Sequence, residues 1–207
     1  QGCHPVLTGC TIRENEGTSE AWAVEFYDAD AVVTDCVFSG NEANSYGGAV
    51  SCYQWSVVSF TRCLLENNFV WQEGSALDLL YGTATFTACR FTGNRANAYA
   101  AFNVIQGTVS LIDCSLTANV SEASPAGLRL INTSRLTAVN TDIRGNADNQ
   151  NGARPDGEVG RGAIATLTCC DVDTTRWDVE GAVTIDNGNC AVPVKKTSLG
   201  NLKSRYR

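Results

Sequence analysis

Hydrophobic and polar positions along this chain follow a pattern that returns every 25 to 29 residues. Its clearest marker is one column of residues, namely Cys10, Cys36, Cys63, Cys89, Cys114, Thr141 and Cys170. An apolar residue stands three positions before each marker, and another stands two positions after it. A further apolar pair follows after a small residue, as in Ala49-Val50-Ser51-Cys52. The chain therefore consists of repeated structural units.

Apolar residues two apart are typical of β-strands, so each unit is predicted to hold three short strands. Its third strand carries the apolar pair, which is Val183/Ile185 in the last unit. One unit cannot bury its apolar side chains alone, but units stacked about 4.8 Å apart close a continuous core. We predict an all-β, right-handed parallel β-helix (solenoid) of about seven rungs over residues 1–190, followed by a basic tail at 191–207.

An asparagine stands five positions after the marker in six units, and Thr175 takes this place in the last. Asparagine tolerates the left-handed backbone geometry of a tight turn, and stacked side-chain amides hydrogen-bond from rung to rung. We therefore predict a structural ladder inside the solenoid. Its members are the asparagines Asn15, Asn41, Asn68, Asn94, Asn119 and Asn146, with the cysteines Cys10, Cys36, Cys63, Cys89 and Cys114.

The segment TDCVFSGNEANSYGGAV at residues 34–50 contains Cys-x-Phe, Asn-x-Ala and Gly-Gly-Ala elements. With these elements the repeats resemble those of the pectate-lyase-like β-helix superfamily. In style they are closest to polymorphic outer-membrane proteins and autotransporter passenger domains. The resemblance covers roughly residues 5–186. It implies the fold and leaves the activity open, because the superfamily includes lyases, hydrolases, adhesins and structural proteins.

Ten cysteines among 207 residues favour an oxidising compartment, so we expect a secreted, extracellular or cell-surface protein. Marker cysteines one rung apart suit either disulfides or a buried ladder of free thiols, and we favour thiols in the middle rungs. Cys52 is predicted to be a lone buried thiol. Three further cysteines lie near the ends of the chain, where disulfides would fix segments that lack a neighbouring rung, and these are Cys3, Cys169 and Cys190. The only histidine is His4, and the cysteine spacing fits no zinc site.

The net charge of −7 is unevenly distributed. Residues 191–207 contain five basic residues and no acidic one, and these are Lys195, Lys196, Lys203, Arg205 and Arg207. An acidic body with a short basic tail argues against nucleic-acid binding, which needs a whole basic face. No apolar run reaches the roughly 18 residues of a membrane span. The tail is either a solvated end or a segment that docks on an acidic body, and we hypothesise the second.

Enzymes of the resembled superfamily use clustered carboxylates on neighbouring rungs, with calcium or as general acids. The acids at outward positions are scattered here, and Asp142/Asp171 is the one adjacent pair. The segment 146–162 interrupts the repeat, and its Asp148, Asp156 and Glu158 match no ordered calcium-ligand spacing. We therefore expect no catalytic residue, no cofactor and no metal, which means a protein that is not an enzyme.

Aromatic residues recur beside the third strand and in the loops before it, and these are Trp22, Tyr27, Tyr46, Tyr53, Trp71 and Tyr99. They either pack under a loop or the tail, or form a surface for a glycan or another subunit. A β-helix also has two open ends with unpaired strand edges. We expect a self-assembling extracellular structural protein that stacks head to tail into a filament. An adhesin or glycan-binding module is the alternative, and a polysaccharide lyase or hydrolase is a weaker third.

Overall fold

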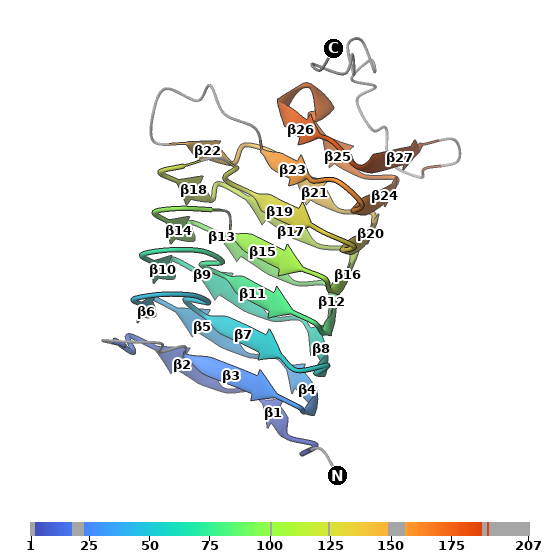
Figure 1. The fold of residues 1–207 in the computed structure, drawn as a ribbon. Helices are drawn as coiled ribbons and strands as arrows, with labels where there is room; N and C mark the ends of the chain where they lie inside the picture. Colours follow the sequence, from blue (N-terminus) through green and yellow to red (C-terminus); the bar gives the residue numbers. More distant parts are fainter. Residues whose placement is uncertain are drawn as a thin grey trace.

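The computed structural model describes residues 3–17, 23–99, 101–123, 125–148, 156–187 and 190. These residues coil into a parallel β-solenoid, which rises in Figure 1 from the blue first rung to the red last one. The strands of successive rungs form four sheets of eight, seven, seven and five strands. The predicted all-β solenoid of about seven rungs is thus confirmed. Within the described residues, no helix has the length and apolar character needed to cross a membrane.

Two sheets flank the cysteine markers. The first sheet precedes the markers and consists of β1 (Val6–Thr8), β4 (Asp30–Thr34), β8 (Val57–Thr61), β12 (Thr83–Thr87), β16 (Thr108–Ile112), β20 (Arg135–Val139), β24 (Ile164–Thr168) and β27 (Ala182–Asp186). The second sheet follows the markers and consists of β2 (Thr11–Arg13), β5 (Val37–Ser39), β9 (Leu64–Glu66), β13 (Arg90–Thr92), β17 (Ser115–Thr117), β21 (Asp142–Ile143) and β25 (Asp171–Val172).

The other two sheets complete each rung. The short sheet follows the asparagine column and consists of β6 (Glu42–Ala43), β10 (Phe69–Val70), β14 (Arg95–Ala96), β18 (Val120–Ser121) and β22 (Ala147–Asp148). The third sheet consists of β3 (Val24–Tyr27), β7 (Val50–Tyr53), β11 (Leu77–Leu80), β15 (Phe102–Ile105), β19 (Leu128–Ile131), β23 (Gly157–Val159) and β26 (Trp177–Val179). A 3-10 turn, η1, spans Thr174–Arg176.

Each rung turns at residues with positive φ. The residue before the marker has φ between 49° and 61° in all seven rungs, from Gly9 to Cys169. The residue before the asparagine column has φ between 54° and 67° in six rungs, from Glu14 to Gly145. Left-handed geometry therefore belongs to the residue before each asparagine, so our prediction that the asparagine itself supplies it is wrong. The chain turns one residue earlier, which lets the asparagine side chain point into the solenoid.

The core is a continuous column of inward side chains. In β12, for example, Ala84 and Phe86 are fully buried, while the residues that alternate with them are half-exposed. Four phenylalanines from two neighbouring rungs pack together at its centre. The ring centroids of Phe60 and Phe86 lie 4.6 Å apart, and those of Phe91 and Phe102 also lie 4.6 Å apart. Burial of these rings stabilises the stack of rungs, because removing one from a core costs about 3–5 kcal/mol.

The structure corrects three details of the predicted repeat. The middle rungs contain a fourth strand of two residues, which carries too little alternation to be seen in the sequence. Val183 and Ile185 lie in β27 of the first sheet, where Ile185 pairs with Leu167, and not in a third strand. The third strand that our alignment missed is β23, which pairs with β19 across the irregular segment. A long connection before β23 shifted its position in the sequence and hid it.

Candidate functional site

The asparagine ladder is the most extensive polar feature of the interior. From Asn15 to Asn146, each side-chain Nδ2 donates to the Oδ1 of the next asparagine at 2.7–3.0 Å. The backbone N–H of each donates to the same Oδ1 at 3.1–3.3 Å. All ladder asparagines except Asn15 are buried. The predicted ladder is present, and its saturated amides hold the rungs together rather than bind a ligand.

The ladder ends at an ion pair instead of a seventh ladder residue. Thr175 lies in η1 and does not continue the column, contrary to our alignment. Arg176 from the same turn donates from Nη2 to the Asn146 carbonyl at 3.2 Å and from Nε to Asp156 Oδ2 at 3.2 Å. Burial raises the pKa of Asp156 to about 6, although Arg176 opposes that rise. This pair closes the polar interior at the C-terminal side.

The marker cysteines form the predicted thiol ladder. Cys36, Cys63, Cys89 and Cys114 are buried and free, and Cys10 at the first rung is half-buried and free. The Cys63 N–H donates to Cys89 Sγ at 3.3 Å. The Cys114 N–H donates to Thr141 Oγ1 at the same distance, 3.3 Å. Thr141 therefore accepts the backbone N–H of the preceding marker, as a thiol does in other rungs. The four buried thiols face the core, so solvent does not reach them as nucleophiles.

The remaining cysteines divide between a disulfide and free thiols. Cys169 and Cys190 form a disulfide, which confirms a bridge near the C-terminal side. Cys3 is free and exposed, so the corresponding bridge at the other end is absent. Cys52 is a buried free thiol, as predicted, and burial raises the pKa of its sulfur. A raised thiol pKa keeps the sulfur protonated and unreactive.

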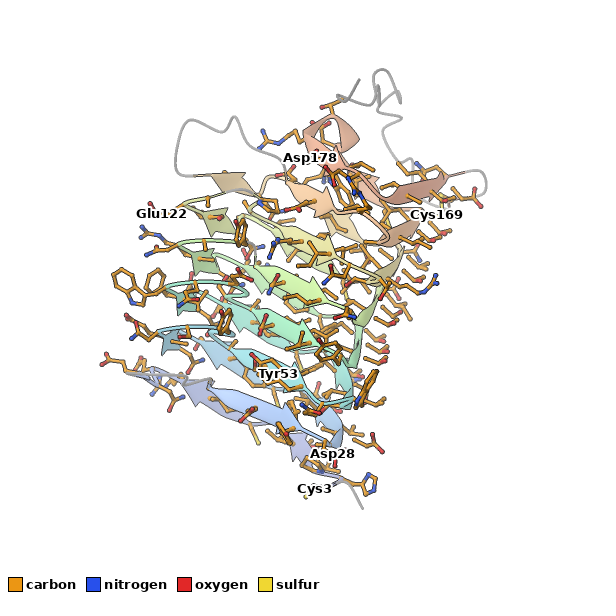
Figure 2. The ribbon with its side chains drawn as sticks, in the orientation of Figure 1. Cys3, Asp28, Tyr53, Glu122, Cys169 and Asp178 are labelled. Atoms are coloured by element: carbon orange, nitrogen blue, oxygen red, sulfur yellow. A yellow bond between two sulfur atoms is a disulfide. The ribbon has the colours of Figure 1, made fainter. Side chains whose placement is uncertain are left out.

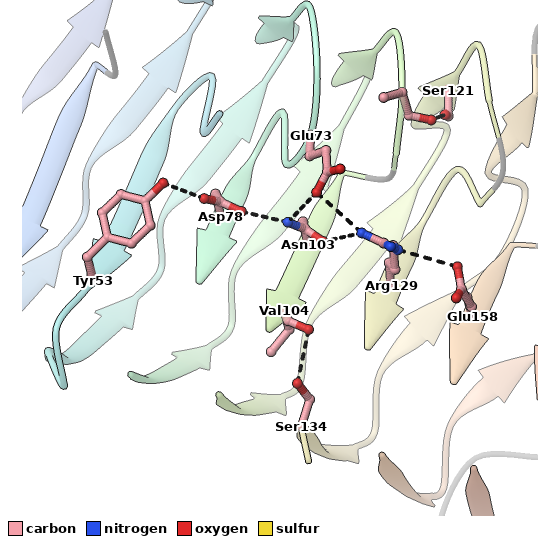
Figure 3. Close-up of polar contacts among 10 residues, drawn as sticks. Tyr53, Glu73, Asp78, Asn103, Val104, Ser121, Arg129, Ser134 and Glu158 are labelled. Carbon is pink, nitrogen blue, oxygen red and sulfur yellow. Dashed lines mark hydrogen bonds and ion pairs between the residues drawn. The ribbon is translucent and has the colours of Figure 1, made fainter. Parts of the chain in front are cut away.

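A second polar cluster, which we call the Arg129 network, lies on the outward side of the third sheet (Figure 3). The Tyr53 hydroxyl donates to Asp78 Oδ2 at 2.6 Å. Asn103 Nδ2 donates to Asp78 Oδ1 at 2.8 Å and to Glu73 Oε2 at 2.9 Å. Arg129 Nη1 donates to the same Glu73 oxygen at 3.3 Å. The network therefore links four successive rungs through their side chains.

Arg129 connects this cluster to the next rung and to an aromatic ring. Its Nε lies 3.5 Å from Glu158 Oε2, and its Cζ lies 4.1 Å from the centroid of the Tyr99 ring. Burial raises the pKa of Asp78 to about 6, while hydrogen bonds from Tyr53 and Asn103 oppose that rise. Burial and the nearby Asp78 also raise the pKa of the Tyr53 hydroxyl. Charge of both signs is thus shielded from water along this face.

Our expectation that the outward acids are scattered is wrong for this face. Asp78 and Arg129 stand in the outward column of the third strand, but Glu73 reaches it from the preceding loop. Glu158 belongs to β23, the strand that the irregular spacing concealed. A correct register for β23 would have aligned Glu158 with Arg129, whereas no sequence signal located Glu73. The carboxylates are bonded within the network, and the described residues contain no group of three potential metal ligands.

The predicted aromatic surface does not form one stripe. Tyr27 pairs with Tyr53 in the third sheet, while Tyr46 and Tyr99 flank Glu73 in a separate column of bridges. Tyr53 and Tyr99 belong to the Arg129 network, so they support structure there. Trp22 lies outside the described residues. Trp55, which the repeat pattern did not indicate, is 72% exposed and packs against Tyr81.

Trp71 belongs to a different surface, which we call the Trp71 ledge. It is an open groove lined by Glu16, Gly17, Glu42, Asn44 and Trp71. The indole is 52% exposed, and its N–H donates to Glu42 Oε1 at 3.2 Å. Glu16 and Glu42 lie side by side on neighbouring rungs. The ledge thus combines an exposed aromatic ring with carboxylate and amide groups.

The other predicted positions carry no assembled site. Asp142 and Asp171 are neighbours, as expected, and Arg144 forms ion pairs with both, so they are solvent-facing structural charges. Of the irregular segment, residues 149–155 lie outside the described part, whereas Asp156 and Glu158 have the roles given above. The tail residues Lys195, Lys196, Lys203, Arg205 and Arg207 also lie outside the described residues.

The fold defines the chain as a parallel β-solenoid protein. No protein-family model matches the sequence, and no curated protein matches it either.

Proposed function

We propose that this protein is an extracellular, self-assembling β-solenoid that serves as a structural element, with rungs of one copy stacking on rungs of the next. The observation that carries the proposal is the state of the two end rungs. At the first rung, Leu7, Ile12 and Val24 pack against the core but are only partly buried. At the last rung, Val183 and Ile185 are partly buried in the same way.

Both end rungs also present strand edges. Among the described residues, β1, β2 and β3 pair with a neighbour on one side only, as do β25, β26 and β27. An open strand edge above partly buried apolar side chains favours the addition of a further parallel strand. Because the two ends of a solenoid differ, such an association is head-to-tail and extends without closure.

The chemistry of the interior supports a role outside the cell and without catalysis. A disulfide such as Cys169–Cys190 persists in oxidising compartments. The Arg129 network directs its carboxylates at partners within the protein, and the ladder thiols face the core. The repeat pattern further supports membership of the pectate-lyase-like superfamily, in the style of autotransporter passenger domains and polymorphic outer-membrane proteins.

Two neighbouring residues of β1 allow a matched test. Leu7 faces the core at the first described rung, whereas Val6 points outward and is 70% exposed. A lysine at position 7 places a charge in the apolar joint, so Leu7→Lys is expected to abolish assembly of the 207-residue protein in sedimentation velocity and electron microscopy. Val6→Lys should assemble as the wild type does. Equal assembly of both variants, or a monomeric wild type at high concentration, would overturn the proposal.

The hypothesis that the basic tail contributes to the joint has its own test. Deletion of residues 192–207 retains every described strand and the Cys169–Cys190 disulfide. If the tail docks on the acidic body of a neighbour, the truncated protein assembles less and the wild-type assembly weakens as salt increases. Assembly of the truncated protein that equals that of the wild type would remove the tail from the proposal and leave the stacked rungs as the joint.

A second function, glycan binding, is favoured by the Trp71 ledge. Aromatic rings bind apolar faces of ligands, while a few carboxylate and amide groups around them fix polar groups such as sugar hydroxyls. Glycan-array binding that is lost in Trp71→Ala and kept in Trp55→Ala would support it. Trp55 is the appropriate control because it is more exposed and lies away from the ledge, against Tyr81. An array without hits for the wild type would refute this second function.

A further inference from the structure

The outward side of the first sheet carries a regular array of small side chains, which we call the hydroxyl face. Its centre column holds, from β1 to β27, Val6, Val32, Ser59, Thr85, Ser110, Thr137, Thr166 and Thr184. The column two residues later holds Thr8, Thr34, Thr61, Thr87, Ile112, Val139, Thr168 and Asp186. The column two residues earlier holds Asp30, Val57, Thr83, Thr108, Arg135, Ile164 and Ala182.

These side chains form a two-dimensional lattice. The strand pairs keep one register through all eight strands, without a bulge or slip. Neighbouring strands lie about 4.8 Å apart, and outward residues recur about every 6.6 Å along a strand. Figure 2 shows the resulting rows of short side chains along the flank formed by β8, β12, β16 and β20. Threonine, valine and isoleucine have restricted χ1 angles, so their methyl and hydroxyl groups occupy few positions.

The hydroxyl face is open to water and nearly free of charge. All of its residues are exposed or half-exposed, and only Asp30, Arg135 and Asp186, all in the two outer columns, are charged. Among its described hydroxyl groups, that of Ser59 alone donates to the protein, at 3.4 Å from the Ala31 carbonyl. The Arg129 network on the third sheet differs from this face, because its polar side chains form hydrogen bonds and ion pairs with one another. The remaining hydroxyls of this face are therefore left to bind water.

We propose that the hydroxyl face is an ice-binding surface. The oxygen lattice of hexagonal ice repeats at spacings close to that between rungs and that between alternate residues of a strand. Rigid methyl groups on such a lattice order the adjacent water, and the hydroxyls between them hydrogen-bond to it. Charged side chains would impose their own hydration on this layer, and the centre column contains none. An ordered water layer on this face then fuses with the growing surface of an ice crystal.

Two other occupants fit the face less well. Crystalline polysaccharides are bound through stacked aromatic rings, and no outward residue of the first sheet is aromatic. A second copy packed face to face would remove many hydroxyls from water, at about 1–3 kcal/mol for each one left unpaired. Ice avoids this cost, because it keeps every hydroxyl bonded to water molecules. Self-assembly through the end rungs leaves the face uncovered, so the two proposals are independent.

The test compares two threonines on different faces. Thr85 lies at the centre of the hydroxyl face, and Thr92 lies at an outward, half-exposed position of the second sheet. Tyrosine suits an outward strand position, so both variants are expected to fold. Thr85→Tyr raises a bulky ring above the lattice and should lower thermal hysteresis and inhibition of ice recrystallisation by about tenfold. Thr92→Tyr should retain wild-type values.

A second variant and two further assays keep the test decisive. Thr137→Tyr alters the same column two rungs away, so it should lose activity even if Thr85→Tyr fails to fold. Folded wild-type protein without thermal hysteresis or recrystallisation inhibition would overturn the proposal. So would pull-down by crystalline cellulose or chitin that Thr85→Tyr abolishes, which would make the face a polysaccharide site. A lateral dimer that the same substitution dissociates would instead make it an interface between copies.

Discussion

Asn68 lies at the middle of the asparagine ladder and makes four hydrogen bonds inside the solenoid. Its Oδ1 accepts from the backbone N–H of Asn41 at 3.1 Å and from Asn41 Nδ2 at 2.8 Å. Its Nδ2 donates to Asn94 Oδ1 at 2.9 Å and to the Phe38 carbonyl at 3.0 Å. Asn68→Ala removes all four and leaves the buried Asn41 N–H without its acceptor. The side chain is fully buried, so water does not replace these partners in the native fold.

The expected loss of stability follows from these contacts. Each buried hydrogen bond contributes about 1 kcal/mol net, and a buried group left without a partner costs about 1–3 kcal/mol. We therefore expect Asn68→Ala to lower the free energy of unfolding by about 3–5 kcal/mol. Asn15→Ala should cost less than about 1 kcal/mol, because Asn15 is exposed at the end of the ladder, where water takes over its contacts.

Urea unfolding followed by circular dichroism measures both effects. Asn67→Gly provides the control, because Asn67 is exposed and has a φ of 54° that glycine adopts without strain. Its midpoint should stay near that of the wild type, whereas that of Asn68→Ala should fall by about 1 M or more. If Asn68→Ala unfolds at the same urea concentration as Asn67→Gly or Asn15→Ala, the buried amides do not hold the rungs together and this reasoning is refuted.

Three further predictions concern titration and sulfur chemistry. Burial raises the pKa of Asp78 from 3.8 to about 6, so the native state keeps a proton that the unfolded state releases. Stability should therefore fall as pH rises from about 4 to about 6, by at most about 3 kcal/mol, and Asp78→Asn should flatten this dependence in urea titrations at each pH. Iodoacetamide should label Cys3 in the native protein but should label Cys52 only after denaturation. Mass spectrometry detects both products, and labelling of Cys52 in the native protein would contradict its burial. The Cys169–Cys190 disulfide closes 21 residues, so replacement of both cysteines by serine should cost about 3 kcal/mol, and unchanged thermal unfolding would argue against it.

The repeat made much of the fold predictable because the solenoid reuses one set of contacts. Each rung buries its side chains against the rung before it, so the same inward positions must be apolar every time. The cysteine and asparagine columns appear in the sequence for this reason, and Thr141 substitutes for a thiol because its hydroxyl accepts the same backbone N–H. Prediction failed where a rung departs from the common length, as at β23 and at η1.

The sequence alone determined the class of fold, the inward ladders and the prediction of buried thiols, because each of these follows from spacing along the chain. Only the tertiary structure decided which outward side chains meet. Glu73 and Glu158 are far apart in the sequence, yet the stacked rungs bring both to Arg129, and Asp78 is linked to them through Asn103. The same register aligns the threonines of the hydroxyl face into rows. Outward residues do not need to be apolar, so they show no regular repeat in the sequence. Their neighbours become known only when the rungs are stacked in register.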